Sequence, residues 1–581
     1  MTTINATFGS VTAGPLTLVK SGQTIKYSLT GTFVGTLQLV KSGTGGNTWD
    51  ILLTRTMASG DTLIIENKDT GDALVGWRCT AYTSGSAITS ITNPAIPEES
   101  TTEPLTQGSR LLIAVGDSVF AGGNTVISGL TIAVANNVAT VTNATNHGLW
   151  PDAEFYLAGP DQYAAWGRFT ALTRTDANGF TFQVPDTYPH TVTGTTISLV
   201  HQGQINDRNY IALACAQMDW PIGRIYNHAA SGMRSDQALM RFDQDVLAYN
   251  PEIVYIQVGT NDAFSGISDL VIKDNITTRV VQALNAGARV ILGLMPPIGP
   301  SATNYTAARA RIVMRVNRYL REWAQQYERV RVLDGFGRVT TIADADWLSG
   351  YSADDTHPNG TAAREISDDA LTILQGWYPN GFKRISTLID RVSSDSSNRQ
   401  IWTNPTFSGS TASPSGAFLN SCTGTIADNL LVTETGSGSC VLTAGVTRTD
   451  RRGFDQQLVF TAAAASDALD LLGDSVHTSV TAGDKIRFWT HMTGTSITNL
   501  ARMIAWLDIV IDGNTYSFDC IKNVSGSYLI NRDFNYYLQS DIFTVPAGSV
   551  TTFRPRWQWL FAGAGGATLK IGCTSIERLE L

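Results

Sequence analysis

Hydrophobic residues in the middle of the chain follow two alternating patterns. Short, uninterrupted apolar runs are typical of strands buried on both faces; they occur at 110–116 ("RLLIAVG"), 220–229, 251–262, 288–297 and 330–336. Stretches with apolar residues at i, i+3, i+4 and i+7 separate them, which predicts helices over 234–250, 268–287 and 306–328. Strands and helices that alternate in this way predict βαβ units around a parallel sheet.

Apolar and polar residues alternate one by one in the rest of the chain, which predicts strands with one buried face. One such region interrupts the α/β pattern directly after its first strand, and the first plausible helix follows it near residue 204. The predicted units are therefore an N-terminal β-sandwich at 1–95, a linker at 96–109, an α/β unit formed by 110–125 and 201–390, an inserted β-domain at 126–200, a linker at 391–400 and a C-terminal jelly-roll-like β-sandwich at 401–581.

Composition and charge narrow the possible partners. The 581 residues are 43% hydrophobic and only 16% charged, with 53 glycines, which favours turn-rich β-modules over helical bundles. The net charge is −9 and lysine and arginine form no cluster, so we expect no nucleic-acid partner. No apolar run approaches the roughly 20 residues of a membrane span, and the first residues lack the pattern of a signal peptide. We therefore expect neither membrane insertion nor export by the usual route.

Six cysteines are spread along the chain without metal-type spacing. Cys422 with Cys440, or Cys520 with Cys573, could form a disulfide, but free buried thiols are the favoured interpretation, also for Cys79 and Cys215. No other metal-binding pattern is present, so we expect neither a metal nor a cofactor.

The tetrapeptide GDSV occurs twice, at 116–119 and at 473–476. A serine hydroxyl needs a histidine to take its proton, a carboxylate to orient that histidine and donors for the oxyanion. Downstream of the first copy lie "NHAASG" at 227–232, "GTND" at 259–262 and "DDTH" at 354–357, each near a predicted strand end or helix start. No such set follows the second copy, which we interpret as a coincidental turn.

Residues 110–125 joined to 201–380 resemble the SGNH/GDSL hydrolases in these four blocks. The resemblance implies a flavodoxin-like, three-layer α/β fold and a serine esterase without a cofactor. It implies the following roles: Ser118 as nucleophile, His357 as general base and acid, Asp354 as its orienting carboxylate, and Ser118, Gly232 and Asn261 as oxyanion donors. Asp117 and Asp262 are expected to brace the loops. The choice of Asp354 over the adjacent Asp355 rests on the family's three-residue spacing alone.

Other histidines and aromatic residues have structural interpretations. His147, His190, His201, His228 and His491 lack a partner set and are interpreted as structural or surface residues. Aromatic platforms for sugar rings are an alternative to core packing at two places, and core packing is favoured at both: Phe553, Trp557 and Trp559 in the C-terminal region, and Trp150, Tyr156, Tyr163 and Trp166 in the inserted one.

The β-modules around the hydrolase-like unit resemble those of bacteriophage tail spikes and tail fibres. This resemblance implies a virion protein made in the host cytoplasm, homotrimeric, attached to phage tail or baseplate proteins, that removes acetyl groups from O-acetylated bacterial polysaccharide. The inserted domain is then expected to border the cleft. Two alternatives remain open: a bacterial carbohydrate esterase with an appended carbohydrate-binding module, and a receptor-binding adhesin with a vestigial site.

Overall fold

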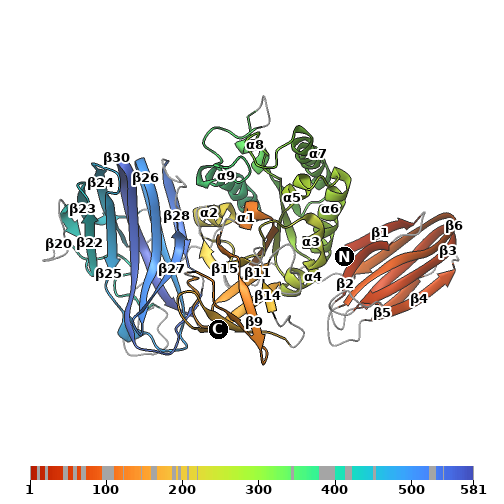
Figure 1. The fold of residues 1–581 in the computed structure, drawn as a ribbon, viewed down its shortest axis with the longest axis horizontal. Coiled ribbons are helices and arrows are strands. Elements are labelled where there is room, and N and C mark those ends of the chain that lie inside the picture. The colour runs from red at the N-terminus through yellow and green to blue at the C-terminus, as the bar shows by residue number, and fades with distance from the viewer. Residues whose placement is uncertain are drawn as a thin grey trace.

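The computed structural model describes residues 110–378 and 400–579, apart from short gaps, and the backbone of six strands between residues 2 and 93. The gaps fall at 122–123, 146, 159–165, 186–190, 194–197, 206–207, 219, 342–345, 413–421, 449–452, 523–531 and 541. Figure 1 shows the succession of units along the chain, with the α/β unit between β-rich parts.

A parallel sheet of five strands forms the centre of the α/β unit, as predicted. Its order is β16-β7-β17-β18-β19, and each neighbouring pair is parallel. The strands are β7 (Leu111–Gly116), β16 (Arg224–Asn227), β17 (Ile253–Gln257), β18 (Arg289–Gly293) and β19 (Val330–Leu333). All five residues of β17 are buried, which explains why the sequence shows a continuous apolar run.

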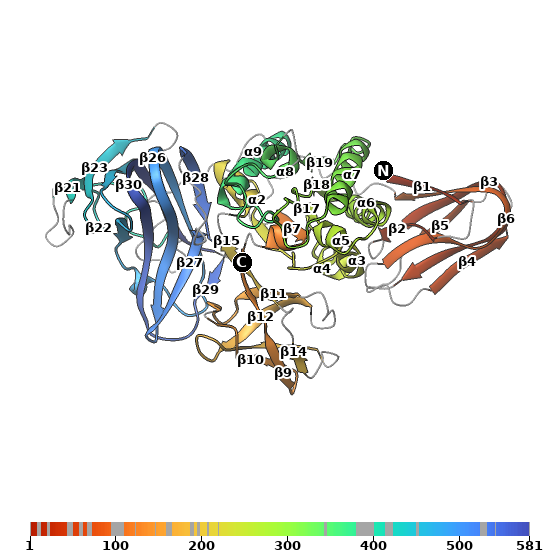
Figure 2. The same cartoon turned by 45° about the horizontal axis from the view of Figure 1, so that its top comes forward.

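Helices cover both faces of this sheet, which gives three layers (Figure 2). Alternate strand residues face opposite layers: Leu112 and Ala114 pack in the hydrophobic cluster shared with α2 (Tyr210–Gln217) and α9 (Gly360–Trp377). Ile113 and Val115 pack in the cluster shared with α6 (Asp269–Asn285) and α7 (Ala307–Ala324). The three-layer prediction is confirmed for this unit.

Short helices fill the connections around the sheet. They are α1 (Ser118–Ala121), α3 (Ser235–Met240), α4 (Phe242–Asp245), α5 (Thr260–Phe264) and α8 (Gly335–Val339). The single helix predicted over 234–250 is wrong, because α3, α4 and a 3-10 turn at Leu247–Tyr249 divide that segment.

The inserted region is an eight-stranded antiparallel sheet shaped as a half-barrel, of order β14-β9-β10-β13-β12-β11-β15-β8. The strands are β8 (Asn124–Ser128), β9 (Thr131–Ala135), β10 (Val138–Val141), β11 (Glu154–Ala158), β12 (Gly167–Arg174), β13 (Phe180–Gln183), β14 (Thr191–Thr193) and β15 (Ser198–Ile205). Asn136 and Asn137 have φ of 51° and 61°, which is the turn chemistry that closes the β9–β10 hairpin.

The C-terminal region differs from the predicted jelly-roll. It is one nearly closed, barrel-like sheet of eleven strands, because β26 (Lys485–Ile511) and β30 (Val550–Arg578) pair with each other along most of their length and continue the sheet on either side. The other strands are β20 (Thr411–Ala412), β21 (Cys422–Ile426), β22 (Leu430–Thr435), β23 (Ser439–Thr447), β24 (Phe454–Ala462), β25 (Ala468–Gly473), β27 (Asn514–Lys522), β28 (Phe534–Gln539) and β29 (Phe543–Thr544).

The N-terminal strands likewise form one sheet, with six antiparallel members. They are β1 (Thr2–Phe8), β2 (Ala13–Val19), β3 (Thr24–Ser42), β4 (Asp50–Thr56), β5 (Thr62–Glu66) and β6 (Ala73–Asn93). This single sheet differs from the predicted N-terminal β-sandwich. Apolar and polar residues alternate in the same way in one sheet of long strands and in two stacked sheets, so the sequence could not distinguish the two arrangements.

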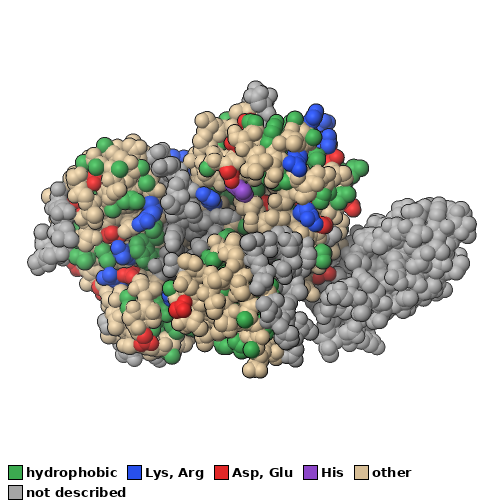
Figure 3. Space-filling model, in the orientation of Figure 1, with side chains coloured by type: hydrophobic (Ala, Val, Ile, Leu, Met, Phe, Trp, Pro, Cys, Tyr) green, Lys and Arg blue, Asp and Glu red, His purple; other side chains and the backbone are tan. Residues whose placement is uncertain are grey.

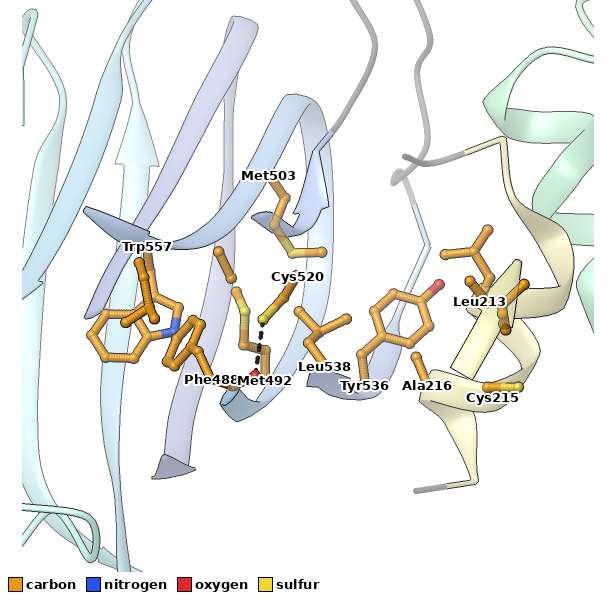
Figure 4. Close-up of a cluster of buried hydrophobic side chains, with 14 of the residues drawn as sticks. Leu213, Cys215, Ala216, Phe488, Met492, Met503, Cys520, Tyr536, Leu538 and Trp557 are labelled. Atoms are coloured by element: carbon orange, nitrogen blue, oxygen red, sulfur yellow. Dashed lines mark hydrogen bonds between the residues drawn. The ribbon is translucent and has the colours of Figure 1, made fainter. Parts of the chain in front are cut away.

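The C-terminal sheet packs directly on the α/β unit. Figure 4 shows Tyr536 and Leu538 of β28 between α2, with Leu213 and Ala216, and the interior of the C-terminal sheet. Arg532, just before β28, forms ion pairs of 2.7 and 2.8 Å with two carboxylates of α9, Glu365 and Asp368. One hydrophobic cluster therefore continues from the α/β unit into the C-terminal sheet.

Buried residues confirm the core interpretation of the aromatic strand. Phe553, Trp557 and Trp559 are 0% exposed, so none of them can serve as a surface platform for sugar rings. In the insertion Trp150, Tyr156 and Trp166 are also buried, and Tyr163 lies outside the described residues.

The described cysteines agree with their interpretation as buried thiols. Cys215, Cys422, Cys440, Cys520 and Cys573 are buried and form no disulfide within the described part of the chain, and the side chain of Cys79 lies outside that part. Within the described ranges, every helix is too short or too polar to span a membrane.

Candidate active site

Ser118 lies where β7 ends and α1 begins. Gly116, the last residue of β7, passes so close to the neighbouring strand that a Cβ there would lie 2.6 Å from the carbonyl oxygen of Gln257. The next amide, that of Asp117, donates to the same carbonyl at 3.2 Å. Glycine therefore allows β7 to lie this close to β17, and Ser118 follows at the carboxyl edge of the sheet, the edge at which parallel sheets form sites.

A chain of hydrogen bonds joins Ser118 to His357 and Asp354. The Nε2 atom of His357 lies 2.8 Å from Ser118 Oγ, and its Nδ1 atom lies 2.6 Å from Asp354 Oδ2. The structure thus brings together the three residues that the sequence predicted, from loops 239 residues apart. This order of hydroxyl, imidazole and carboxylate allows the ring to take the serine proton while the carboxylate stabilises the resulting charge.

Hydrogen bonds within the loop of Asp354 and His357 stabilise its conformation. Asp354 Oδ1 accepts hydrogen bonds from the backbone amides of Thr356 at 3.0 Å and His357 at 2.8 Å, and Ser352 Oγ donates to the His357 carbonyl at 2.7 Å. Partial burial works to raise the pKa of the Asp354 carboxyl, but the hydrogen bonds from the His357 ring and backbone hold that pKa well below its usual value. Asp354 is therefore ionised wherever a neutral histidine could act as a base.

Asp355, the neighbouring carboxylate, makes different contacts. Its φ is +57°, its carbonyl accepts from the amide of Gly299 at 2.8 Å, and its Oδ2 accepts from the amide of Ser301 at 3.0 Å. Asp355 thus holds the loop that follows β18, while Asp354 contacts the imidazole. Of the two adjacent carboxylates, Asp354 is the one that contacts the imidazole, a distinction that the sequence could not make without the family spacing.

Three candidate oxyanion donors lie on loops that hydrogen bonds tie to one another. The amide of Ala230 donates to the Gly116 carbonyl at 3.0 Å, which fixes the loop of Gly232 beside β7. The side-chain amide of Asn261 donates to the Met233 carbonyl at 3.0 Å, and its second hydrogen stays available. The backbone amides of Ser118 and Gly232 make no hydrogen bond within the described part of the chain. These groups can therefore donate to an oxyanion.

The two supporting aspartates are both buried, as expected for bracing residues. Asp117 accepts from the amides of Val119 at 3.0 Å and Thr260 at 3.3 Å, and so links the Ser118 loop to the Asn261 loop. Asp262 accepts from Ser235 through both the hydroxyl, at 2.5 Å, and the amide, at 2.8 Å. Burial raises the pKa of both carboxyls, that of Asp117 to about 6.

The second GDSV copy lies in a turn of the C-terminal sheet. Asp474 accepts from Trp402 Nε1 at 2.7 Å and Thr403 Oγ1 at 2.8 Å, and Ser475 Oγ accepts from the Phe553 amide at 3.1 Å. These contacts close a turn after β25, in agreement with the interpretation of this copy as a turn.

Exposure separates His357 from the other described histidine side chains. His147, His228 and His491 are buried, whereas the side chain of His357 is 35% exposed. Figure 3 shows a histidine at the surface beside acidic side chains over the α/β unit. The side chains of His190 and His201 lie outside the described part. Among the described residues, no three His, Cys, Asp or Glu side chains are grouped to hold a metal ion.

Sequence reasoning missed two contributors to this site. Ser352 supports the His357 carbonyl from five residues upstream, and Tyr156 of the insertion stacks on His228 at 4.4 Å between ring centroids. A serine in a polar loop and a tyrosine in a strand carry no signal of such contacts, which arise only in three dimensions.

The raised pKa of Asp117 predicts a specific pH dependence of stability. Its folded-state pKa of about 6 exceeds the ordinary 3.8, so the folded protein binds this proton more tightly than the unfolded chain does. The associated stability is present below pH 4 and is lost as the pH rises through 6, by about 3 kcal/mol. Asp117→Asn should therefore gain stability relative to the wild type by about that amount between pH 4 and 7 in denaturant unfolding. Parallel pH profiles for the two proteins would contradict this explanation.

Comparisons with known proteins agree with the site. Residues 192–364 match the sequence profile of the GDSL-like Lipase/Acylhydrolase family. The matched segment includes Gly232, Asn261, Asp354 and His357, and it excludes Ser118, which precedes the inserted sheet. No curated protein matches the chain.

Several solved structures are similar to part of the chain. A GDSL-like lipase from Bacteroides thetaiotaomicron is 21% identical, over 27% of this chain and 75% of that one, with a TM-score of 0.24. A member of the lipolytic protein G-D-S-L family from Veillonella parvula is 14% identical, over 46% and 99%, with a TM-score of 0.26. An acetylxylan esterase from Geobacillus stearothermophilus is 13% identical, over 46% and 94%, with a TM-score of 0.28. On the strength of the family match, the central α/β unit is a GDSL-like lipase/acylhydrolase (SGNH) domain.

Proposed function

We propose that this protein is a serine esterase that removes O-acetyl groups from a bacterial surface polysaccharide. The observation that carries the proposal is the hydrogen-bonded chain from Ser118 through His357 to Asp354 at the open edge of a GDSL-like domain. A site of this kind needs no cofactor for acyl transfer to water.

The reaction follows from the positions of the groups. Ser118 Oγ attacks the ester carbonyl carbon while His357 Nε2 takes the hydroxyl proton, and Asp354 stabilises the imidazolium. The carbonyl oxygen becomes an oxyanion that accepts from the amides of Ser118 and Gly232 and from Asn261. The C–O bond to the sugar then breaks, and the sugar oxygen leaves with the proton from His357. Water, deprotonated by His357, attacks the acyl-serine in the same way, releasing acetate and restoring Ser118.

Two features of the carboxyl edge of the sheet support a polymeric substrate. The side chains of His357 and Asp354 are 35% and 54% exposed, so the ester can approach while the rest of a polymer stays in solvent. A cavity of about 110 Å³ follows the carboxyl ends of β18 and β19, and Tyr305, which is 37% exposed, lies on its wall. Its lining residues are Pro297, Ile298, Pro300, Tyr305, Ala310, Met314, Phe336 and Asp346. A partly exposed ring on the loop that follows β18 can pack against a sugar.

We further propose that the protein acts in a bacteriophage tail spike or tail fibre, as a homotrimer attached to tail or baseplate proteins. What supports this is the resemblance of the flanking β-modules to such proteins. A bacterial carbohydrate esterase with a binding module is the second candidate, and the direct packing of the C-terminal sheet on α2 and α9 is compatible with both. A vestigial site on an adhesin is disfavoured, because the hydrogen bonds from Ser118 to Asp354 are complete.

Two adjacent carboxylates provide an internal test of the catalytic roles. Asp354→Asn should lower kcat for p-nitrophenyl acetate by on the order of 10³–10⁴, because the imidazole loses its charged partner. Asp355→Asn removes the same charge one residue away and should change kcat by less than about tenfold, since Asp355 contacts the Ser301 amide. Steady-state kinetics of both variants measures the contrast. Equal losses would remove the special role assigned to Asp354.

Acetate release tests the substrate class. Proton NMR of purified O-acetylated capsule or O-antigen should record free acetate with the wild type and none with Ser118→Ala, which loses the nucleophile. The melting temperature of the variant serves as the folding control. Hydrolysis of p-nitrophenyl acetate by the wild type without acetate release from any polymer would retain the esterase and reject the polysaccharide substrate.

A further inference from the structure

The inserted sheet meets the GDSL-like domain at the strand that leads into the Gly232 loop. Strand β16 is the edge strand of the parallel sheet, and Tyr226 and His228 lie two residues apart at its end. On the inserted side, Tyr156 of β11 and Arg168 of β12 are direct cross-strand partners. An i, i+2 pair on one sheet therefore faces a cross-strand pair on the other: Tyr156 lies against His228, and Arg168 lies against Tyr226.

The contacts between the two pairs are close and buried. The rings of Tyr156 and His228 are stacked, with centroids 4.4 Å apart and planes inclined by 15°, and both side chains are 1% exposed. The guanidinium of Arg168 lies 3.7 Å from the centroid of the Tyr226 ring and donates to its hydroxyl at 2.6 Å. Stacked rings and a cation over a ring are both attractive, and both are stronger without water.

Hydrogen bonds fix the orientation of this stack. The Tyr156 hydroxyl donates to Asp245 Oδ2 at 2.7 Å, and His228 Nδ1 lies 2.6 Å from the Asp245 carbonyl oxygen. Arg241 holds the same carboxylate through two hydrogen bonds of 2.9 and 3.0 Å. Because the carbonyl can only accept, His228 Nδ1 carries the proton, and burial lowers the pKa of His228 to about 4, so the ring is neutral at pH 7.

The stack lies directly before a candidate oxyanion donor. The backbone amides of His228 and Ala230 donate to the carbonyls of Ala114 and Gly116, at 2.8 and 3.0 Å, so the segment continues the pairing with β7. Gly232 follows with a φ of +79°, a conformation that glycine adopts at no steric cost. Backbone hydrogen bonds to β7 therefore hold His228 and Ala230, and the inserted sheet holds the side chain of His228 just before Gly232.

We propose that Tyr156 is a positioning residue for the esterase reaction, and that the inserted sheet belongs to the catalytic scaffold by holding the Gly232 loop through the Tyr156–His228 stack. This inference rests on the proposed esterase function. It gives the insertion a role in the turnover of every ester, small or polymeric, in addition to any contact with a polysaccharide. An oxyanion donor displaced by about 1 Å costs on the order of 10²-fold in rate, so the stack matters even though it touches no substrate.

A matched pair of substitutions on one strand tests the proposal. Tyr156 and its neighbour Phe155 point to opposite faces of β11, and Phe155 packs within the insertion against Phe169, Phe180 and Phe182. Tyr156→Leu should lower kcat for p-nitrophenyl acetate between about 10- and 100-fold with little change in KM. Phe155→Leu removes a ring from the same strand and should leave kcat within about twofold. Tyr156→Phe keeps the stack and should lose less than about fivefold.

A transition-state analogue provides a readout that a purely structural role would not change. Phenylboronic acid forms an anionic adduct with an activated serine, and one of its oxygens occupies the oxyanion position. For Tyr156→Leu, its inhibition constant should rise in parallel with the fall in kcat, at a temperature well below the melting transition; for Tyr156→Phe it should stay near the wild-type value. If the Leu variant does not fold, Tyr156→Met replaces it, because a flexible side chain fills the space without a ring.

The outcomes separate this inference from the function on which it rests. A wild type without Ser118-dependent hydrolysis rejects the esterase and the inference together. A wild type that is active, with Tyr156→Leu and Phe155→Leu alike in kcat and in the inhibition constant, rejects the positioning role alone. A Phe variant as impaired as the Leu variant rejects the stack as its cause and points to the hydroxyl bond with Asp245.

Discussion

The hydrogen bond between His357 and Ser118 is the interaction on which the proposed catalytic site depends. It joins two loops that are 239 residues apart, and it forms because both loops lie at the carboxyl edge of one parallel sheet. The second bond of the chain is local: Asp354 folds back on its own loop, accepts two backbone amides and still reaches the imidazole. The contact of His357 with Ser118 thus depends on the parallel sheet, whereas the contact of His357 with Asp354 depends on four consecutive residues.

The loops around this bond are held by groups that never touch a substrate. Asp117 joins the Ser118 loop to the Asn261 loop by accepting hydrogen bonds from two backbone amides, and burial of its carboxyl raises its pKa. Asn261 reaches the Gly232 loop through the Met233 carbonyl, and Tyr156 braces the same loop from the inserted sheet. The geometry of the candidate site therefore depends on several chain segments together, including the inserted sheet, which lies between Ser118 and most of the segment that matches the family profile.

The sequence predicts most of the site and only part of the architecture. Uninterrupted apolar runs and four short blocks predicted the parallel sheet and the loops of Ser118 and His357, because buried strands and strand-end loops leave local patterns. The choice of Asp354 over Asp355 needed the family's spacing in addition. The barrel-like C-terminal sheet was not predictable, since alternation records which face of a strand is buried and not which strand it pairs with. The contact of Tyr156 with His228 was not predictable either. The sequence pattern around a buried strand tyrosine is the same whether its ring packs within its own sheet or against a neighbouring one.

Covalent labelling distinguishes the two GDSV serines of the chain by their reactivity. A fluorophosphonate reacts with a serine only where a base and oxyanion donors activate it. Peptide mass spectrometry of the labelled protein should find the adduct on Ser118 and none on Ser475, with labelling abolished in His357→Ala. Modification of Ser475, or a Ser118 that stays unmodified in the folded protein, would contradict the account.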